Sequence, residues 1–171
     1  ALTAGQTAVL ERAATALAAD RDLIRRLTAL VAVARDGRVG LGERELLARA
    51  ADHLSAAFHG DALRLAVVAD GVARWAAGTE GEGEPVDDGW IRAAIERGDS
   101  IEEPGPPTRF VVPMLGREGA VGAVEVVRLG RAFSDRDRAL LESLGSALAV
   151  LIENGRLYRR VDRLFRQILP S

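Results

Sequence analysis

Few side chains in this sequence could carry chemistry. Cysteine is absent, which excludes a thiolate nucleophile, a disulfide and a thiolate metal site. The two histidines, His53 and His59, are six positions apart, so one face of a helix does not present both. Ser55 and His59 would be neighbours on a helix, but no acid completes a nucleophile–base–acid set. The sequence therefore predicts no catalytic residues, and its histidine spacing disfavours a metal or haem site.

Two charged residues within apolar segments are more informative about function than the histidines. Arg109 opens one such segment, and Glu125 interrupts a run of valines. A carboxylate in a buried strand is costly unless it is paired or solvated. Two interpretations stay open: Glu125 faces a polar pocket and holds a ligand with Arg109 nearby, or the two form a cross-strand ion pair on an exposed face. Strand alternation places Val121, Ala123 and Val127 on the same side as Glu125.

The two tryptophans, Trp75 and Trp90, are candidates for the walls of such a pocket. A buried indole seeks a partner for its N–H group, and core packing is the alternative role. Trp90 and Ile91 begin a segment that we expect to be a helix with both side chains facing inward. The predicted ligand-binding residues are therefore Trp75, Trp90, Ile91, Arg109 and Glu125.

Hydrophobic periodicity predicts the elements that position these residues. Three-four spacing indicates helices, and short apolar runs bounded by turn residues indicate strands. Asp70-Gly71 is typical of a tight hairpin turn. Asp87 or Asp88 can cap a helix that ends at Gly98. The expected order is a helix over 43–58, a hairpin over 63–69 and 72–78, a helix from Asp87 or Asp88 to about Arg97, and a second hairpin over 109–115 and 120–129.

Two long helices are expected to flank this part. One covers 7–34, which is rich in Ala, Leu and Arg and contains no Gly or Pro. The other starts at Ser134, whose hydroxyl can accept from a free backbone N–H, with Asp135 and Asp137 at the positive end of the helix dipole. Each carries an apolar seam typical of a coiled coil or bundle. The predicted dimer contacts are Leu17, Ile24, Leu27, Val31, Leu151, Asn154, Tyr158, Val161 and Phe165.

The seam of the last helix has two interpretations. Residues 144–151 could simply pack on the sheet, whereas the stripe from Tyr158 to Ile168 extends beyond any sheet this small and requires another partner. A second copy of the chain is the simplest partner. Asn154 would then fix the register of the paired helices at some cost in stability.

Composition narrows the function classes. A formal net charge of −2 argues against a nucleic-acid partner, and the arginines after position 155 fit the solvated face of a helix. Apolar runs stay well short of the roughly 18–20 residues that a membrane span needs. The start of the chain does not match a signal peptide. We therefore expect a cytoplasmic protein without a membrane partner.

The last hairpin and helix resemble a known family. The segments Phe110-Val-Val-Pro-Met-Leu and Gly119-Ala-Val-Gly-Ala-Val-Glu-Val-Val are similar to the strand pair of a GAF domain. The segments from Phe133 to Leu144 and from Val150 to Tyr158 are similar to its closing helix. The resemblance implies an α+β fold, with an antiparallel sheet flanked by helices and a small-molecule pocket on one face. It also implies long terminal helices that form a dimer bundle or coiled coil.

The resemblance further implies a sensor that passes a change to an attached output domain. Bilin-binding members attach their pigment through cysteine, which is missing here, and the Asn-Lys-x-Asp-Glu-like pattern of cyclic-nucleotide binders is also missing. No cofactor is evident. We expect a signalling helix over 1–36, a GAF-like domain over 37–150 and a linker helix over 151–171. The last residues are similar to linkers that precede cyclase or phosphatase domains of bacterial signalling proteins.

The sequence thus predicts a non-catalytic, homodimeric, bacterial sensor or relay domain that binds a small molecule. The alternative is a structural dimerisation module whose pocket is filled by its own side chains.

Overall fold

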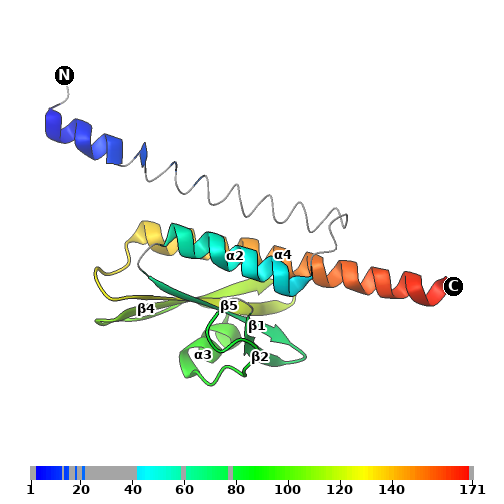
Figure 1. Ribbon diagram of the computed structural model, residues 1–171. Coiled ribbons are helices and arrows are strands. Elements are labelled where there is room, and N and C mark those ends of the chain that lie inside the picture. The colour runs from blue at the N-terminus through cyan, green and yellow to red at the C-terminus, as the bar shows by residue number, and fades with distance from the viewer. Residues whose placement is uncertain are drawn as a thin grey trace.

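The computed structural model describes residues 3–12, 14–15, 18, 21, 42–58, 61–76 and 79–169. Within them, five antiparallel strands form one sheet in the order β2-β1-β5-β4-β3, with helices on both faces (Figure 1). This confirms the predicted antiparallel sheet flanked by helices, and the dimer bundle stays a prediction. The elements are α2 (Glu43–Ala57), β1 (Ala62–Ala69), β2 (Val72–Trp75), α3 (Gly89–Arg97), β3 (Ile101–Glu103), β4 (Thr108–Gly116), β5 (Gly119–Arg128) and α4 (Asp135–Ile168).

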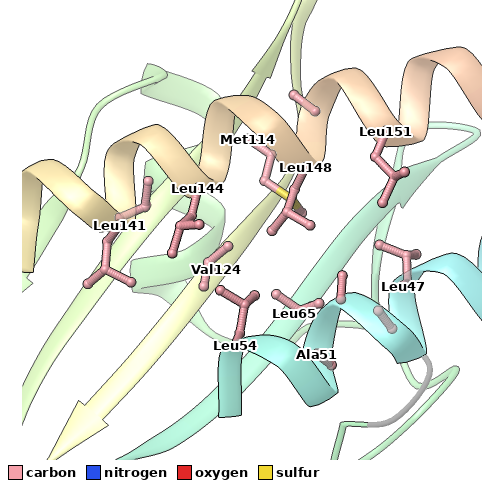
Figure 2. Packing of buried hydrophobic residues seen from close by; sticks show 14 of the residues in the cluster. Leu47, Ala51, Leu54, Leu65, Met114, Val124, Leu141, Leu144, Leu148 and Leu151 are labelled. Atoms are coloured by element: carbon pink, nitrogen blue, oxygen red, sulfur yellow. The ribbon is translucent and has the colours of Figure 1, made fainter. Parts of the chain in front are cut away.

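Helices α2 and α4 lie side by side over one face of the sheet (Figure 1). Their apolar sides and the strand residues that face them form the larger core. Burying leucine-sized side chains contributes about 1.5–3 kcal/mol each, so this layer dominates the stability of the fold. Figure 2 shows the packing of Leu47, Ala51, Leu54, Leu65, Met114, Val124, Leu141, Leu144, Leu148 and Leu151.

Helix α4 begins where the sequence predicts. The Ser134 hydroxyl accepts from the Asp137 N–H at 3.1 Å, and the Asp137 carboxylate accepts from the Ser134 N–H at 3.0 Å. This capping box satisfies two backbone donors that the first turn would leave free. Arg128 at the end of β5 then links this helix terminus to the ends of β5 and β1, with Nη1 2.9 Å from Asp137 and Nη2 2.8 Å from Asp61.

Helix α3 covers part of the opposite face. The Asp88 side chain accepts from the N–H groups of Trp90 and Ile91, and Gly98 ends the helix in the left-handed conformation at φ 68°. Of the two aspartates that the sequence offers as the cap, Asp88 is the one used, and the predicted end at Gly98 is confirmed. Ile91 and Ala94 of α3 pack in a smaller cluster with Ala66, Trp75, Val86, Val111 and Ala123.

Two features of the strands differ from the sequence prediction. Strand β3 was missed, because a three-residue strand has too few positions to show alternation. Val121 packs against the α2–α4 core rather than beside Glu125. Met114 pairs with Gly122 and Leu115 with Ala120, so Val121 is the extra residue of a bulge, which interrupts the alternation of side chains.

The predicted dimer seam divides into three parts. Four of its residues lie outside the described part of the chain: Leu17, Ile24, Leu27 and Val31. Of the predicted N-terminal helix, the structure describes residues 4–12 as helical. Leu151 is buried in the monomer core, because its side of α4 faces the sheet and α2. Beyond Ile152 no described residue of α4 is buried, and the helix is unbroken from the domain into the predicted linker. Its exposed large apolar residues there are Leu157, Tyr158, Val161, Leu164, Phe165 and Ile168.

Two glycines of α4 provide a matched test of this packing. A methyl group on Gly145 would lie 2.9 Å from Val112 Cγ1 and 3.0 Å from the Pro113 carbonyl oxygen, whereas one on Gly155 would meet no atom within 4 Å. Overpacking costs about 1–3 kcal/mol, which exceeds the gain of about 0.5–1 kcal/mol from replacing a helical glycine by alanine. We expect Gly145→Ala to lower the free energy of unfolding and Gly155→Ala to raise it. Urea denaturation at unchanged m-value measures both, and stabilisation by both would contradict the close approach of α4 to β4.

Candidate functional site

A buried carboxylate lies at the centre of the sheet face that α3 partly covers. Glu125 on β5 is only 2% exposed. Arg64 of β1 is its direct cross-strand partner, with Nε 2.7 Å from Oε1. Arg109 of β4 donates from Nε to the other oxygen, Oε2, at 2.6 Å. The two strands next to β5 therefore each supply one arginine, and both oxygens of the buried carboxylate are paired.

Two further carboxylates surround Arg109. Asp88 Oδ2 lies 2.7 Å from Arg109 Nη2, while Asp88 Oδ1 accepts from the first turn of α3. Glu103 Oε2 of β3 lies 3.6 Å from Arg109 Nη1. Arg109 thus contacts Glu125 on β5, Glu103 on the edge strand β3 and Asp88 at the N-terminus of α3.

The electrostatics follow from this arrangement. Burial raises the pKa of Asp88, but hydrogen bonds from Arg109 and the Ile91 N–H, with the positive charge of Arg109, outweigh it and hold this pKa below its ordinary value. Burial lowers the pKa of Arg109, but Asp88 and Glu125 outweigh it and the net shift is upward. Both groups are therefore charged at neutral pH.

An open cavity of about 390 Å³ is lined by these charges. The loop Pro104-Gly105-Pro106-Pro107 and Val127 complete its wall. Its volume lies in the range of small-molecule sites, about 300–1,000 Å³. Two arginines against three carboxylates give the lining a formal charge of −1. We call this the Glu125 cavity; its charged residues are Arg64, Asp88, Glu103, Arg109 and Glu125.

No family model matches the chain, and no curated protein matches it. Solved structures do match. The GAF domain of a phosphoenolpyruvate-protein phosphotransferase from Acinetobacter superposes with a TM-score of 0.65 at 15% identity, over 82% of this chain and 97% of that one. The corresponding domain from Coxiella burnetii gives 0.65 at 16% identity, over 82% and 96%. The chain has the GAF fold.

A third structure with this fold is an enzyme. The type II free methionine-R-sulfoxide reductase from Thermoplasma acidophilum superposes with a TM-score of 0.55 at 20% identity, over 65% of this chain and 92% of that one. Structures with this fold therefore include an enzyme, and the residues of this chain must decide its function. Among the described residues, no cluster of His, Asp and Glu could hold a metal ion, and no helix is long and apolar enough to cross a membrane.

Of the two interpretations of Arg109 and Glu125, the ion pair is present in the structure, and ligand binding by these residues stays a prediction. They form the cross-strand ion pair, and the same pair lines a cavity. The face is not solvent-exposed at Glu125, which contacts the side chains of Arg64 and Arg109. Arg64 and Glu103 were missed: Arg64 lies in the middle of an apolar strand, and only its register against Glu125 shows its role.

The other predicted ligand-binding residues do not line the Glu125 cavity. Trp75 is buried beside it, and the Arg64 guanidinium stacks 3.9 Å from its ring centroid, which positions that arginine. Ile91 is fully buried in the α3 cluster. The prediction that Trp90 faces inward is wrong: it is 40% exposed, because its position at the start of α3 points away from the sheet while Ile91 points toward it.

Strand β3 connects this site to the opposite face of the sheet. Glu103 contacts Arg109 in the cavity, whereas the neighbouring Glu102 accepts from Arg138 of α4 at 2.8 and 3.1 Å. Ser100, just before β3, donates to Glu142 of α4 at 3.3 Å. Successive residues of a strand point to opposite faces, which explains how a short strand reaches both layers.

Removing Arg109 tests the network. Loss of one partner of a buried ion pair costs about 3–5 kcal/mol, and Arg64 retains one contact with Glu125. We expect Arg109→Met to lower the free energy of unfolding by about 3 kcal/mol. The control, Arg49→Met, breaks an exposed pair with Glu45 on α2 and should cost less than about 0.5 kcal/mol. Equal, small losses in urea denaturation would show that Glu125 does not depend on Arg109.

Proposed function

We propose that this domain is a non-catalytic sensor that binds a small polar molecule in the Glu125 cavity and relays the change through α4 to an attached output domain. One observation carries the proposal: a buried, paired carboxylate lies in the wall of an open cavity of ligand size. Buried charges are costly, and they concentrate at functional sites. The proposal includes the cytoplasm of a bacterium as its location, and a cyclase- or phosphatase-like domain as the output.

The lining favours a particular ligand chemistry. Asp88 and Glu103 are partly exposed and have acceptor capacity beyond their contact with Arg109. The terminal nitrogens of Arg64 make no hydrogen bond within the described residues and can donate. A cavity with a carboxylate excess disfavours a phosphate ligand. It favours a small neutral, zwitterionic or cationic molecule with several hydrogen-bonding groups.

Strand β3 supplies a physical route for the signal. A ligand that competes with Arg109 for Glu103 displaces β3, and Glu102 and Ser100 carry the displacement to Arg138 and Glu142 of α4. Helix α4 is continuous from its capping box to Ile168, so a change at its first turns can reach its exposed end. Coupling of this kind requires that the ligand bind the two positions of β3 with different affinity.

The exposed part of α4 is the proposed contact with a second copy. Tyr158, Val161 and Phe165 lie at three-four spacing, and Phe165 is 59% exposed. Isolated surface apolar residues are ordinary, but a continuous stripe on one helix indicates an interface. The rival proposal, a dimerisation module without a ligand, rests on this stripe and on the internal pairing of the Glu125 network.

Native mass spectrometry tests both proposals in one measurement. We expect a homodimer with excess mass from a retained small molecule. Tyr158→Ser with Phe165→Ser should give a monomer that keeps this mass, because the seam lies far from the cavity. Asp88→Asn with Glu103→Gln should give a dimer that loses it.

The outcomes separate the two functions. A dimer of bare chains contradicts the sensor and supports the structural module. A bare monomer contradicts both. An unchanged dimer after substitution of Tyr158 and Phe165 removes the argument from the α4 stripe.

A further inference from the structure

A second cavity lies where α4 leaves the domain. It has a volume of about 360 Å³, is open to solvent, and is lined by the turn between β4 and β5, the first residues of β5 and residues within 153–160 of α4. We call it the hairpin groove. It is separate from the Glu125 cavity, since the two share no lining residue.

Unused hydrogen-bond donors meet in the hairpin groove. Within the described residues, Asn154 Nδ2 is buried and has no hydrogen-bond partner. A buried polar group without a partner costs about 1–3 kcal/mol, so its persistence requires an explanation. Arg117 from the turn and Arg160 from α4 also line the groove. Among the residues that the structure describes, neither guanidinium forms an ion pair.

Two other charged residues of the groove already have hydrogen-bond partners. Arg156 donates to Glu43 at 2.9 Å and to the Val68 carbonyl at 2.6 Å. Glu153 Oε1 accepts the Arg117 backbone N–H at 2.7 Å, which fixes this carboxylate against the turn. Three arginines against Glu118 and Glu153 give the lining a formal charge of +1, opposite in sign to that of the Glu125 cavity.

We propose that the hairpin groove binds a small oxyanion, the carboxylate or phosphate group of a metabolite. Its oxygens accept from Asn154 Nδ2, Arg117 and Arg160, and thereby satisfy the buried amide. Charge-assisted hydrogen bonds of this kind are about twice as strong as neutral ones.

The position of the groove gives this anion a regulatory effect. Arg117 belongs to the turn and Arg160 to α4, so one anion ties the hairpin to the helix. Ile152 is the last buried residue of α4, and the groove therefore lies at the point where the helix loses its support from the sheet. Occupancy stiffens α4 there, independently of what the Glu125 cavity binds.

Isothermal titration calorimetry with pyrophosphate and, separately, citrate at constant ionic strength tests the site on the whole chain. We expect saturable binding of at least one, which identifies a phosphate or a carboxylate as the preferred group. Asn154→Asp is isosteric and places a negative charge against the anion, and Arg117→Ala with Arg160→Ala removes the free cations. Each should weaken binding by about tenfold or more. Arg92→Ala, an exposed control on α3, should leave it unchanged.

Three results would overturn the proposal. The first is that neither anion binds saturably at millimolar concentration. The second is that the double arginine variant and the Arg92 control bind the anion equally strongly. The third is that the double variant changes the subunit count without changing anion affinity, which would make the groove a contact between copies. The arginine variant alters only exposed side chains and therefore remains informative if Asn154→Asp fails to fold. Asp88→Asn with Glu103→Gln should keep full anion affinity, which separates this site from the Glu125 cavity.

Discussion

Burial of one carboxylate constrains the sheet. Glu125 lies on the central strand β5, where water cannot solvate its charge, and an unpaired charge at that depth would cost several kcal/mol. Arg64 and Arg109 must therefore approach from the two neighbouring strands, which fixes the register of β1 and β4 around it. Arg109 in turn positions Asp88 at the start of α3 and Glu103 on β3. One buried charge thus orders four elements besides its own strand.

The two faces of the sheet divide the tasks of the domain. The α2–α4 face is an apolar layer whose packing supplies most of the stability. The opposite face combines a small apolar cluster under α3 with the Glu125 cavity. Strand β3 contacts both layers through adjacent glutamates. A fold of this kind can bind on one side and respond on the other without a large rearrangement of its core.

Local sequence signals are enough to predict the helix starts, the first hairpin turn and one charge pair. Ser134 and Asp88 mark helix starts through their side-chain acceptors, and Asp70-Gly71 forms a turn in which both residues adopt positive φ. Glu125 and Arg109 were recognisable as a pair because a charge in an apolar strand needs compensation.

Features that tertiary contacts determine could not be predicted. Arg64 takes its role from cross-strand register, and Val121 changes face because of a bulge. The side of α3 that faces the sheet decides between Trp90 and Ile91, and three-four spacing alone did not distinguish them. Leu151 belongs to the stripe of α4 that a dimer would use, yet the sheet buries it first. The sequence of a helix does not show how much of its length packs on the sheet.

Hydrogen exchange tests directly whether β3 links the Glu125 network to α4. Arg109→Met alters only the cavity face, whereas residues 135–142 of α4 contact the opposite face. We expect the backbone amides of 101–103 and 135–142 to exchange faster in this variant, by a larger factor than those of α4 around Leu148. The Arg49→Met variant should show no such pattern. Faster exchange confined to α3 and to β4–β5 beside the cavity, with 135–142 unchanged relative to Leu148, would contradict the link.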